Sequence, residues 1–384
     1  MDNFVCQNCG GCVFRNVAEA TYRKNKEDDF KKTIALIKNA QPIFDEPIFI
    51  SDHSRRRAEM TFRFIKKQLV FGFNQQASHD IADIQSCPLL VDELNNLLPK
   101  IRRFLEELCA ITITKKNKNK LITSRIQEGD IHLLKADNGV DIILHVKDKP
   151  ELEHRLLIAD FVNQNADVCR VSWQINASYA ETIIQKSMPE LYIAGYTVHI
   201  PQSIFLQASK TAENIMIEKV LSYLGNTHGK IADLFCGLGT FTYPLTKIPN
   251  CEIVSADSYE PSLQGLRNAL NFNQIHNVSV VCRNLFKYPF DKDDFKDIQA
   301  VIIDPPRAGA HEQCREIAKL STQSKPHKIV FVSCNPKTFT FDAELLINAG
   351  YHFERVVLID QFVYSKHQEL IALFTLTSKH IKEN

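Results

Sequence analysis

The sequence lacks any run of about 18 apolar residues, the length that a helix needs to cross a bilayer, so we expect no membrane-spanning segment. Its first residues carry neither the basic nor the apolar stretch of a secretory signal, which favours the cytoplasm. It also has almost no net charge, because 46 Lys and Arg residues balance 45 Asp and Glu residues. The molecule as a whole is therefore not attracted to nucleic acid, and any RNA-facing charge must be local.

Three short basic segments could supply such local charge. They are residues 55–57, the pair Arg102 and Arg103, and the lysine-rich run 115–120. Segments of this kind more often form a solvated surface than a phosphate site. If they do contact phosphates, binding should weaken steeply as the salt concentration rises.

A chain of 384 residues is long enough for two or three domains. We expect a cysteine-containing segment with a hairpin over residues 1–90 and a strand-rich RNA-binding domain over 91–200. Apolar residues alternate with polar ones from Arg57 to Phe64, which is typical of an antiparallel strand. The other elements expected here are helices near 18–37, 92–108 and 151–165, and strands near 109–114, 131–135, 140–146, 168–175 and 191–199.

Residues 201–384 change to a rhythm of alternating strands and helices. This rhythm predicts an α/β domain with a mostly parallel sheet covered by helices on both faces. Ligands of such sheets bind at the carboxyl ends of the strands. The expected helices are 209–224, 261–273, 311–320 and 338–348, and the expected strands are 230–235, 251–256, 278–282, 298–303, 327–333, 353–359 and 368–376.

The turn after strand 230–235 contains Gly237 and Gly239, and glycines let backbone approach a ligand closely. By itself such a pair is equally a tight strand-to-helix turn. A dinucleotide site would have a third glycine where Thr242 stands, which argues against NAD. Asp257 ends the next strand, where a carboxylate can accept hydrogen bonds from ribose hydroxyls.

Further reactive side chains lie beside three later strands. Asp304 and two prolines follow the apolar strand 300–303, although prolines can also simply end a strand. Cys334 follows strand 329–333 and is either a small core residue or a thiolate nucleophile. Glu369 precedes the last strand and offers a carboxylate that could act as a base.

These features occur together in an order that resembles the RNA 5-methyluridine methyltransferases. The likeness covers the C-terminal half and implies a Rossmann-like domain that uses S-adenosylmethionine (SAM). The matching motifs are Phe205-Leu206-Gln207, Asp233-Leu234-Phe235-Cys236-Gly237-Leu238-Gly239, Asp304-Pro305-Pro306-Arg307-Ala308-Gly309, Ser333-Cys334-Asn335-Pro336 and His367-Gln368-Glu369.

The resemblance implies a covalent mechanism. Carbon 5 of uracil is a poor nucleophile, so in this family a cysteine thiolate adds to carbon 6 before carbon 5 takes the methyl group of SAM. This assigns Cys334 as the nucleophile and Glu369 as the base that removes the carbon-5 proton. By similarity, the residues that bind SAM are Gln207, Phe235, Gly237, Gly239, Asp257, Asn284 and Asp304.

Three cysteines, Cys6, Cys9 and Cys12, lie within seven residues of one another. Thiols this close in a reducing compartment indicate a metal site, either zinc or an iron–sulfur cluster, and Cys87 is the best candidate for a fourth ligand. The 23S rRNA branch of the resembled family carries a [4Fe-4S] cluster on such cysteines. We therefore favour the iron–sulfur cluster and the rRNA branch, whose shorter RlmC type resembles this chain more than the RlmD type does.

The other cysteines need no special role. We expect Cys109, Cys169, Cys251 and Cys282 in the core beside apolar strands. Cys314 lies on an expected helix, and Cys236 is interpreted as a packing residue near the cofactor turn.

The favoured hypothesis is a SAM-dependent methyltransferase that acts on a uridine of 23S rRNA, works as a monomer and needs no protein partner. A tRNA enzyme of the same family is one alternative, which the thiol cluster disfavours. An RNA-binding protein without catalysis is the other, and the presence of both Cys334 and Glu369 argues against it.

Overall fold

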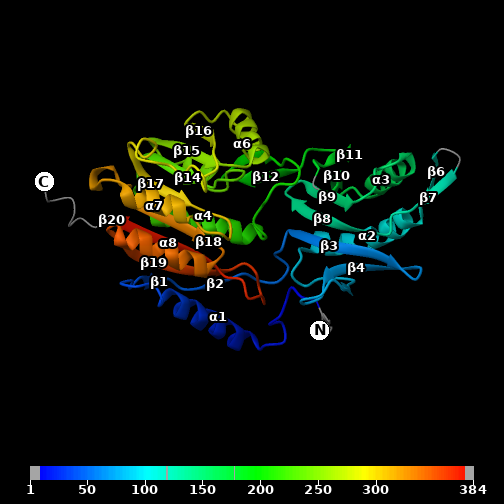
Figure 1. Ribbon diagram of the computed structural model, residues 1–384, viewed down its shortest axis with the longest axis horizontal. Helices are drawn as coiled ribbons and strands as arrows, with labels where there is room; N and C mark the ends of the chain where they lie inside the picture. Colours follow the sequence, from blue (N-terminus) through cyan, green and yellow to red (C-terminus); the bar gives the residue numbers. More distant parts are fainter. Residues whose placement is uncertain (1–8, 118–119, 177, 377–384) are drawn as a thin grey trace.

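The computed structural model describes residues 9–117, 120–176 and 178–376. They form two halves, each built on its own sheet (Figure 1). None of the helices in these ranges is long and apolar enough to cross a membrane. The helices are α1 (Glu19–Ile34), α2 (Asp92–Ala110), α3 (Leu152–Gln164), α4 (Lys210–Leu224), α5 (Thr242–Leu245), α6 (Glu260–Phe272), α7 (His311–Lys319) and α8 (Pro336–Asn348).

The strands are β1 (Ile43–Phe44), β2 (Ile48–Phe49), β3 (Arg57–Ile65), β4 (Gln68–Asn74), β5 (Ile81–Asp83), β6 (Ile113–Asn117), β7 (Lys120–Ser124), β8 (Glu128–Ala136), β9 (Gly139–Val146), β10 (Val168–Ile175), β11 (Glu181–Gln185), β12 (Glu190–Ile193), β13 (Tyr196–His199), β14 (Gly229–Leu234), β15 (Cys251–Asp257), β16 (Val278–Cys282), β17 (Ile298–Ile303), β18 (Lys328–Ser333), β19 (Tyr351–Asp360) and β20 (Glu369–Leu376).

The C-terminal half is the expected α/β domain. Its strands run in the order β1-β19-β20-β18-β17-β14-β15-β16, and β2 also pairs with β19. The strands from β14 to β18 are mutually parallel, whereas β20 runs antiparallel to β18 and β19. Strands such as β18 are apolar without alternation because helices cover both faces of the sheet.

The two faces of this sheet are covered by different helices. Apolar side chains of α4, α5 and α6 pack on one face, and those of α1, α7 and α8 pack on the other. Phe30 and Ile34 of α1 are buried in this second layer, although α1 lies far from it in the sequence. In Figure 1 the helix runs along the sheet beside β1 and β19.

Residues before position 50 therefore belong partly to the C-terminal half. Strands β1 and β2 each add a short parallel pairing to β19. Asp45 accepts hydrogen bonds from Arg355 of β19 and from Tyr223 of α4, which anchors this segment. The expected division at residue 90 did not anticipate this, because sequence order gives no sign that a segment leaves one sheet for another.

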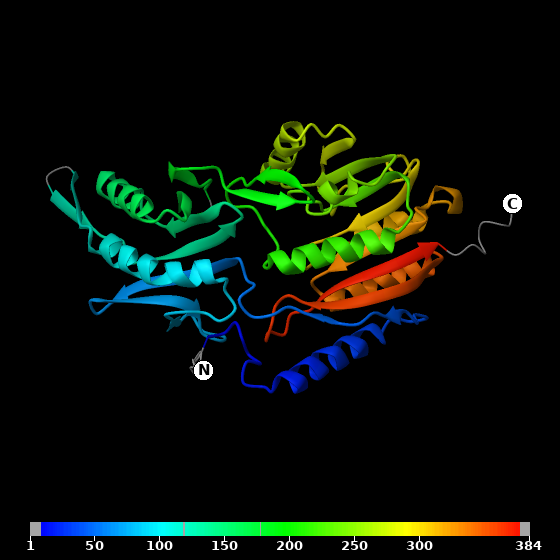
Figure 2. The ribbon, with the colours of Figure 1, turned by 180° about the vertical axis from the view of Figure 1, so that it is seen from behind.

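The N-terminal half is strand-rich, as expected. Its sheet has the order β11-β10-β9-β8-β3-β4-β5 and is antiparallel except between β9 and β10. Helices α2 and α3 pack against its apolar face. The hairpin of β6 and β7 projects at the far end of this half (Figure 2).

Two local expectations were wrong. The strand expected at 109–114 is instead the end of α2 followed by β6, so Cys109 is a buried helix residue. The single strand expected at 191–199 is the hairpin of β12 and β13. In both cases short apolar runs fit either structure, and the amphipathic stripe of α2 continues through Leu105 and Leu108.

A buried ion pair joins the two halves. Arg56, which directly precedes β3, donates from Nη2 to Oε2 of Glu213 on α4 at 2.6 Å and from Nε to the carbonyl oxygen of Gln207 at 3.0 Å. Both charged side chains are almost fully buried. Removing one partner would leave the other charge buried and unpaired.

We therefore expect Arg56→Met to lower the free energy of unfolding by about 3–5 kcal/mol, the usual cost of an uncompensated buried charge. Urea-induced unfolding followed by circular dichroism measures this. The matched control is Arg103→Met, which breaks an exposed pair with Glu107 and should cost less than about 1 kcal/mol. Equal losses in the two variants would contradict a special role for the buried pair.

Candidate active site

The candidate site lies where the carboxyl ends of the central parallel strands meet. β14 has β15 on one side and β17 on the other, so the chain changes direction across the sheet at β14. Such a switch point opens a crevice at the strand ends. The turn after β14, Asp257 at the end of β15 and Asp304 after β17 all lie at this edge.

The turn after β14 has an unusual backbone. Phe235 has a positive φ of 64°, as do Gly237 at 55° and Gly239 at 99°. A Cβ on Gly239 would lie 2.7 Å from Leu266, whereas one on Gly237 would meet nothing within 4 Å. Gly239 is thus required for packing of the turn, and Gly237 faces open space where a ligand can approach.

Two carboxylates hold the turn. Asp257 accepts hydrogen bonds from the backbone N–H of Gly237 at 3.0 Å and of Tyr259 at 2.9 Å, one on each oxygen. Buried Asp233 accepts a hydrogen bond from the hydroxyl of Thr242 at 2.6 Å. Thr242, which stands where a dinucleotide-binding motif has its third glycine, therefore has a structural role as the hydrogen-bond partner of Asp233.

Two further predicted cofactor residues lie on either side of this turn's edge of the sheet, Asn284 near the turn itself and Gln207 nearer Glu369. The side chain of Asn284, just after β16, accepts hydrogen bonds from the N–H groups of Phe286 and Lys287. This turn brings the Phe286 ring to 5.5 Å from the Phe235 ring, measured between centroids. Gln207 is buried and lies before α4, on the side of the edge nearer Glu369.

Cys334 and Glu369 come together at the same edge. β18 and β20 pair antiparallel with Ser333 opposite Leu370. Cys334, which follows Ser333, therefore lies beside Glu369, which precedes Leu370. Glu369 is buried, and Cys334 is half-buried, two residues before helix α8 begins. The backbone pairing of β18 and β20 therefore brings these two predicted site residues together.

Burial raises the pKa of three carboxylates at this edge. Burial raises the pKa of Asp304 well above its usual value, and the charges of Glu369, Asp233 and Asp257 add to this. Burial also raises the pKa of Asp233 to about 7 and that of Glu369 to about 7. A site with this much negative charge in a low dielectric favours a cationic ligand.

The Cys334 thiol is affected by the same carboxylates. Burial raises its pKa to about 11, and the charges of Glu369 and Asp304 contribute, whereas Arg307 lowers it. Its position before the first turn of α8 favours the thiolate through the helix dipole. A cation bound beside the carboxylates would remove most of the opposing charge.

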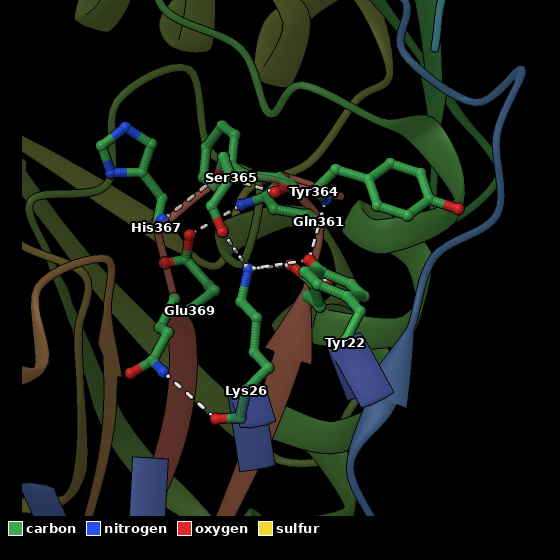
Figure 3. Close-up of polar contacts among 10 residues, drawn as sticks. Tyr22, Lys26, Gln361, Tyr364, Ser365, His367 and Glu369 are labelled. Atoms are coloured by element: carbon green, nitrogen blue, oxygen red, sulfur yellow. Dashed lines mark hydrogen bonds and ion pairs between the residues drawn. The ribbon is translucent and has the colours of Figure 1, made fainter. Parts of the chain in front are cut away.

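Gln361 is a site residue that sequence reasoning missed. Its buried side-chain amide donates from Nε2 to Oε2 of Glu369 at 2.7 Å and to Oε1 of Gln207 at 3.1 Å, and the first of these contacts is visible in Figure 3. It therefore joins the predicted base to a predicted cofactor residue. A glutamine that follows an apolar strand carries no chemical signal by itself.

Arg307 and Asn335 tie two motif loops together. The Asn335 side chain donates to the carbonyl oxygen of Arg307 at 2.9 Å and caps helix α8. The guanidinium of Arg307 lies 2.8 Å from Nδ1 of His367. The loops after β17 and β18 and the loop before β20 thus form one connected edge.

Comparison with known proteins identifies the family. Residues 20–376 match the family model described as tRNA (Uracil-5-)-methyltransferase. The chain belongs to this family. Its fold also matches the crystal structure of Pyrococcus abyssi tRNA (uracil-54, C5)-methyltransferase in complex with S-adenosyl-L-homocysteine, with a TM-score of 0.70 and 20% identity over 96% of this chain and 86% of that one.

Members of this uracil-5-methyltransferase family with rRNA substrates are also similar to the chain. The 23S rRNA (uracil(1939)-C(5))-methyltransferases RlmD of Aliivibrio fischeri and Haemophilus influenzae are each 30% identical to it. The matches cover 96% of this chain and 81% and 80% of those proteins. An uncharacterised RNA methyltransferase of Agrobacterium fabrum is 32% identical over 95% of this chain and 82% of that one.

The cysteines predicted to bind metal in this family member lie partly in the described residues. Cys6 lies outside them. Cys9 and Cys87 are close enough to Cys12 that their charges, after burial, raise its pKa to about 12. Within the described ranges, no three His, Cys, Asp or Glu side chains are arranged as a ready site for a metal ion.

Three arginines of the predicted basic segments are held inside the protein by their surroundings. Arg56 is buried in its ion pair, and Arg102 donates to the carbonyl oxygens of Phe71 and Ile84 and to Asp83. Burial, with the charges of its two arginine neighbours, lowers the pKa of Arg57 to about 10. These arginines are structural, and the side chains of 115–122 are not described.

The remaining cysteines are buried with one exception. Cys109, Cys169, Cys236, Cys251 and Cys314 lie in the core as expected. Cys282 was expected there too and is instead exposed at the end of β16. β16 is the edge strand of the sheet, so its side chains are only partly covered.

We expect Asp257→Ala to weaken binding of S-adenosyl-L-homocysteine at least about tenfold, because a charged acceptor and the anchor of Gly237 are both lost. Isothermal titration calorimetry measures the affinity, and a thermal melt confirms that the variant is folded. Glu252→Ala, an exposed change on the same strand, is the matched control and should bind normally. Equal affinity in the two variants would contradict a cofactor role for Asp257.

Proposed function

We propose that this protein transfers a methyl group from SAM to carbon 5 of a uridine in 23S rRNA. The observation that carries the proposal is the pairing of β18 with β20, which sets the Cys334 thiol beside the Glu369 carboxylate at the carboxylate-lined edge. A thiol and a buried carboxylate are the two groups that uracil C5 methylation requires. The similarity to RlmD enzymes supports rRNA as the substrate.

Each reacting side chain then has a defined task. The Cys334 thiolate forms a bond to carbon 6 of the uracil, and the electron pair of the C5–C6 double bond moves to the ring as an enolate. SAM supplies the methyl group that carbon 5 takes up. Glu369 removes the proton from carbon 5, the electrons of that C–H bond restore the C5–C6 double bond, and the C6–S bond breaks to release the Cys334 thiolate.

The environment of Glu369 suits this task. With a pKa near 7 it is a stronger base than an exposed carboxylate and is still substantially ionised at neutral pH. The amide of Gln361 favours its charged form and fixes its orientation. The negative charge around Asp304 and Asp257 gives a reason for the cationic cofactor to bind beside them.

The target base must leave its stack to reach Cys334, as in other enzymes that act on a nucleobase. Pro305 and Pro306 stiffen the loop after β17 next to Asp304, and Pro306 is exposed at this edge. We assign this loop as the platform for the extruded uracil.

The substrate branch is tested by methylation of transcripts with labelled SAM. We expect incorporation into a 23S rRNA fragment and not into tRNA. The uridine named for the RlmD relatives, 1939, is the first to replace by cytidine. Incorporation into tRNA alone would support the tRNA enzyme instead. The RlmC-like character suggested by the sequence would be supported if the uridine at 1939 is not the one modified.

The covalent mechanism predicts opposite behaviour of two variants. Glu369→Ala should accumulate an RNA–protein adduct that survives a denaturing gel, because methylation can occur but the carbon-5 proton stays in place. Cys334→Ala should form no adduct, since the attacking thiolate is absent. Equal adduct levels in the two variants would rule out these roles.

We also propose that Cys6, Cys9, Cys12 and Cys87 hold a [4Fe-4S] cluster. The mutual effect of Cys9, Cys12 and Cys87 on pKa supports this, because thiols gathered and buried in this way need a cation to become thiolates. The cluster would stabilise the N-terminal segment and need not take part in methyl transfer.

Anaerobically purified protein should therefore be brown, with the broad visible absorbance of iron–sulfur charge transfer and about four irons per chain. Cys87→Ser should lose both the colour and the iron. Cys109→Ser, a buried cysteine away from the cluster, is the control and should keep them. Colourless protein that contains one zinc per chain would contradict the iron–sulfur assignment.

A further inference from the structure

The loop that leads to the proposed base is fastened to helix α1. Residues 361–368 connect β19 to β20 and end directly before Glu369. Lys26 projects from α1 to the start of this loop, where its Nζ lies 2.6 Å from Oδ1 of Asp360 (Figure 3). The two side chains are 4% and 0% exposed, so this is a buried ion pair between segments 334 residues apart.

Lys26 reaches further along the same loop. Its Nζ also donates to the carbonyl oxygen of Ser365 at 3.0 Å. Its own carbonyl oxygen accepts a hydrogen bond from the side chain of Gln368 at 3.3 Å. One residue of α1 therefore contacts the last residue of β19, the middle of the loop and the last residue of the loop, and Figure 3 shows the contact with Ser365.

Tyr22, one turn earlier on α1, completes the arrangement. Its hydroxyl donates to Oδ2 of Asp360 and accepts hydrogen bonds from Nζ of Lys26 at 3.1 Å and from the backbone N–H of Tyr364 at 2.8 Å. Both oxygens of Asp360 are thus occupied by groups from α1. The backbone at position 360 can hardly rotate while these bonds are made.

Asp360 lies next to Gln361, the residue that orients the proposed base Glu369. Gln361 follows Asp360 and donates to both Glu369 and Gln207. Ile359, just before Asp360, pairs with Glu369 across the two strands. A small rotation at Asp360 would therefore move the Gln361 amide away from the Glu369 carboxylate.

Anchoring of α1 does not need this ion pair. Phe30 and Ile34 already bury the helix against the sheet. Burial lowers the pKa of Lys26, while Asp360 acts in the opposite direction, so the charge is held there at a desolvation cost. Well-packed apolar residues often stabilise as much as a buried ion pair does, which points to a role in position rather than in stability.

We propose that Lys26 is a positioning residue for methyl transfer, which holds Gln361 and Glu369 in place through Asp360 and Ser365, with Tyr22 as its partner. This rests on the proposed role of Glu369 as the base. The step it governs is removal of the carbon-5 proton and release of Cys334. Addition of Cys334 and methyl transfer do not require Glu369 to be aligned.

The test separates the two steps. A 23S rRNA fragment carrying tritium at carbon 5 of its uridines is mixed with enzyme and 14C-methyl SAM in a single turnover. Incorporation of 14C reports methyl transfer, and tritium appearing in water reports proton removal. The variants are Lys26→Met and Tyr22→Phe, and Lys24→Met, an exposed lysine of the same helix, is the matched control.

In Lys26→Met we expect tritium release to slow about tenfold relative to methyl transfer, and the covalent adduct to accumulate, because small misplacements of a catalytic group have effects of this size or larger. Tyr22→Phe keeps its ring and should slow release about threefold. Lys24→Met should behave as wild type. A purely structural role would lower both readouts in parallel and leave their ratio unchanged.

The proposal is wrong if folded Lys26→Met and Tyr22→Phe both keep the wild-type ratio of tritium release to methyl incorporation. If Lys26→Met fails to fold, Tyr22→Phe decides, since it removes one hydroxyl without leaving a charge unpaired. The same assay on Glu369→Ala separates the two hypotheses. If Glu369→Ala keeps the wild-type ratio of tritium release to methyl incorporation, the role of Glu369 as the base is wrong, and so is the positioning role of Lys26. If this ratio changes in Glu369→Ala, the Lys26→Met and Tyr22→Phe variants decide the role of Lys26.

Discussion

The antiparallel pairing of β20 with β18 positions the two groups on which the proposed chemistry depends. Both strands are apolar along their length and buried on both faces, so their register is fixed by the helices above and below the sheet. A slip of one residue would turn Glu369 to the other side of the sheet. The geometry of the proposed base and nucleophile therefore depends on the packing of the core.

The same burial sets the electrostatics of the site. Burial raises the pKa values of Asp233, Asp304 and Glu369, and for Asp304 the charges of the other two carboxylates add to this rise. This charge raises the pKa of the nearby Cys334 thiol as well. A cationic cofactor resolves both problems together, since it stabilises the carboxylates and removes the repulsion that opposes the thiolate.

Much of the site could be predicted from the sequence because its residues follow strands. The apolar runs before Asp304 and Cys334 mark strand ends, and parallel strand ends share an edge. Gln361, Tyr22 and Lys26 could not be found in this way. A lysine on a helix with mixed charge predicts a solvated surface, and its partner Asp360 is more than 300 residues away. The exposed Cys282 was missed because sequence pattern does not reveal which strand lies at an edge.

The N-terminal segment meets the loop before Glu369 from a second direction. The backbone N–H of Phe14 donates to the carbonyl oxygen of Tyr364 at 2.9 Å, and the Arg15 guanidinium lies 4.6 Å from the centre of the Tyr364 ring. Cys12 stands two residues before Phe14. A group that fixes the cysteines would therefore also restrict the chain that contacts this loop, and Tyr22 of α1 contacts the same residue, Tyr364. The proposed base, Glu369, is held by the pairing of β20 with β19. The loop before it is held by α1, which lies more than 300 residues earlier in the sequence.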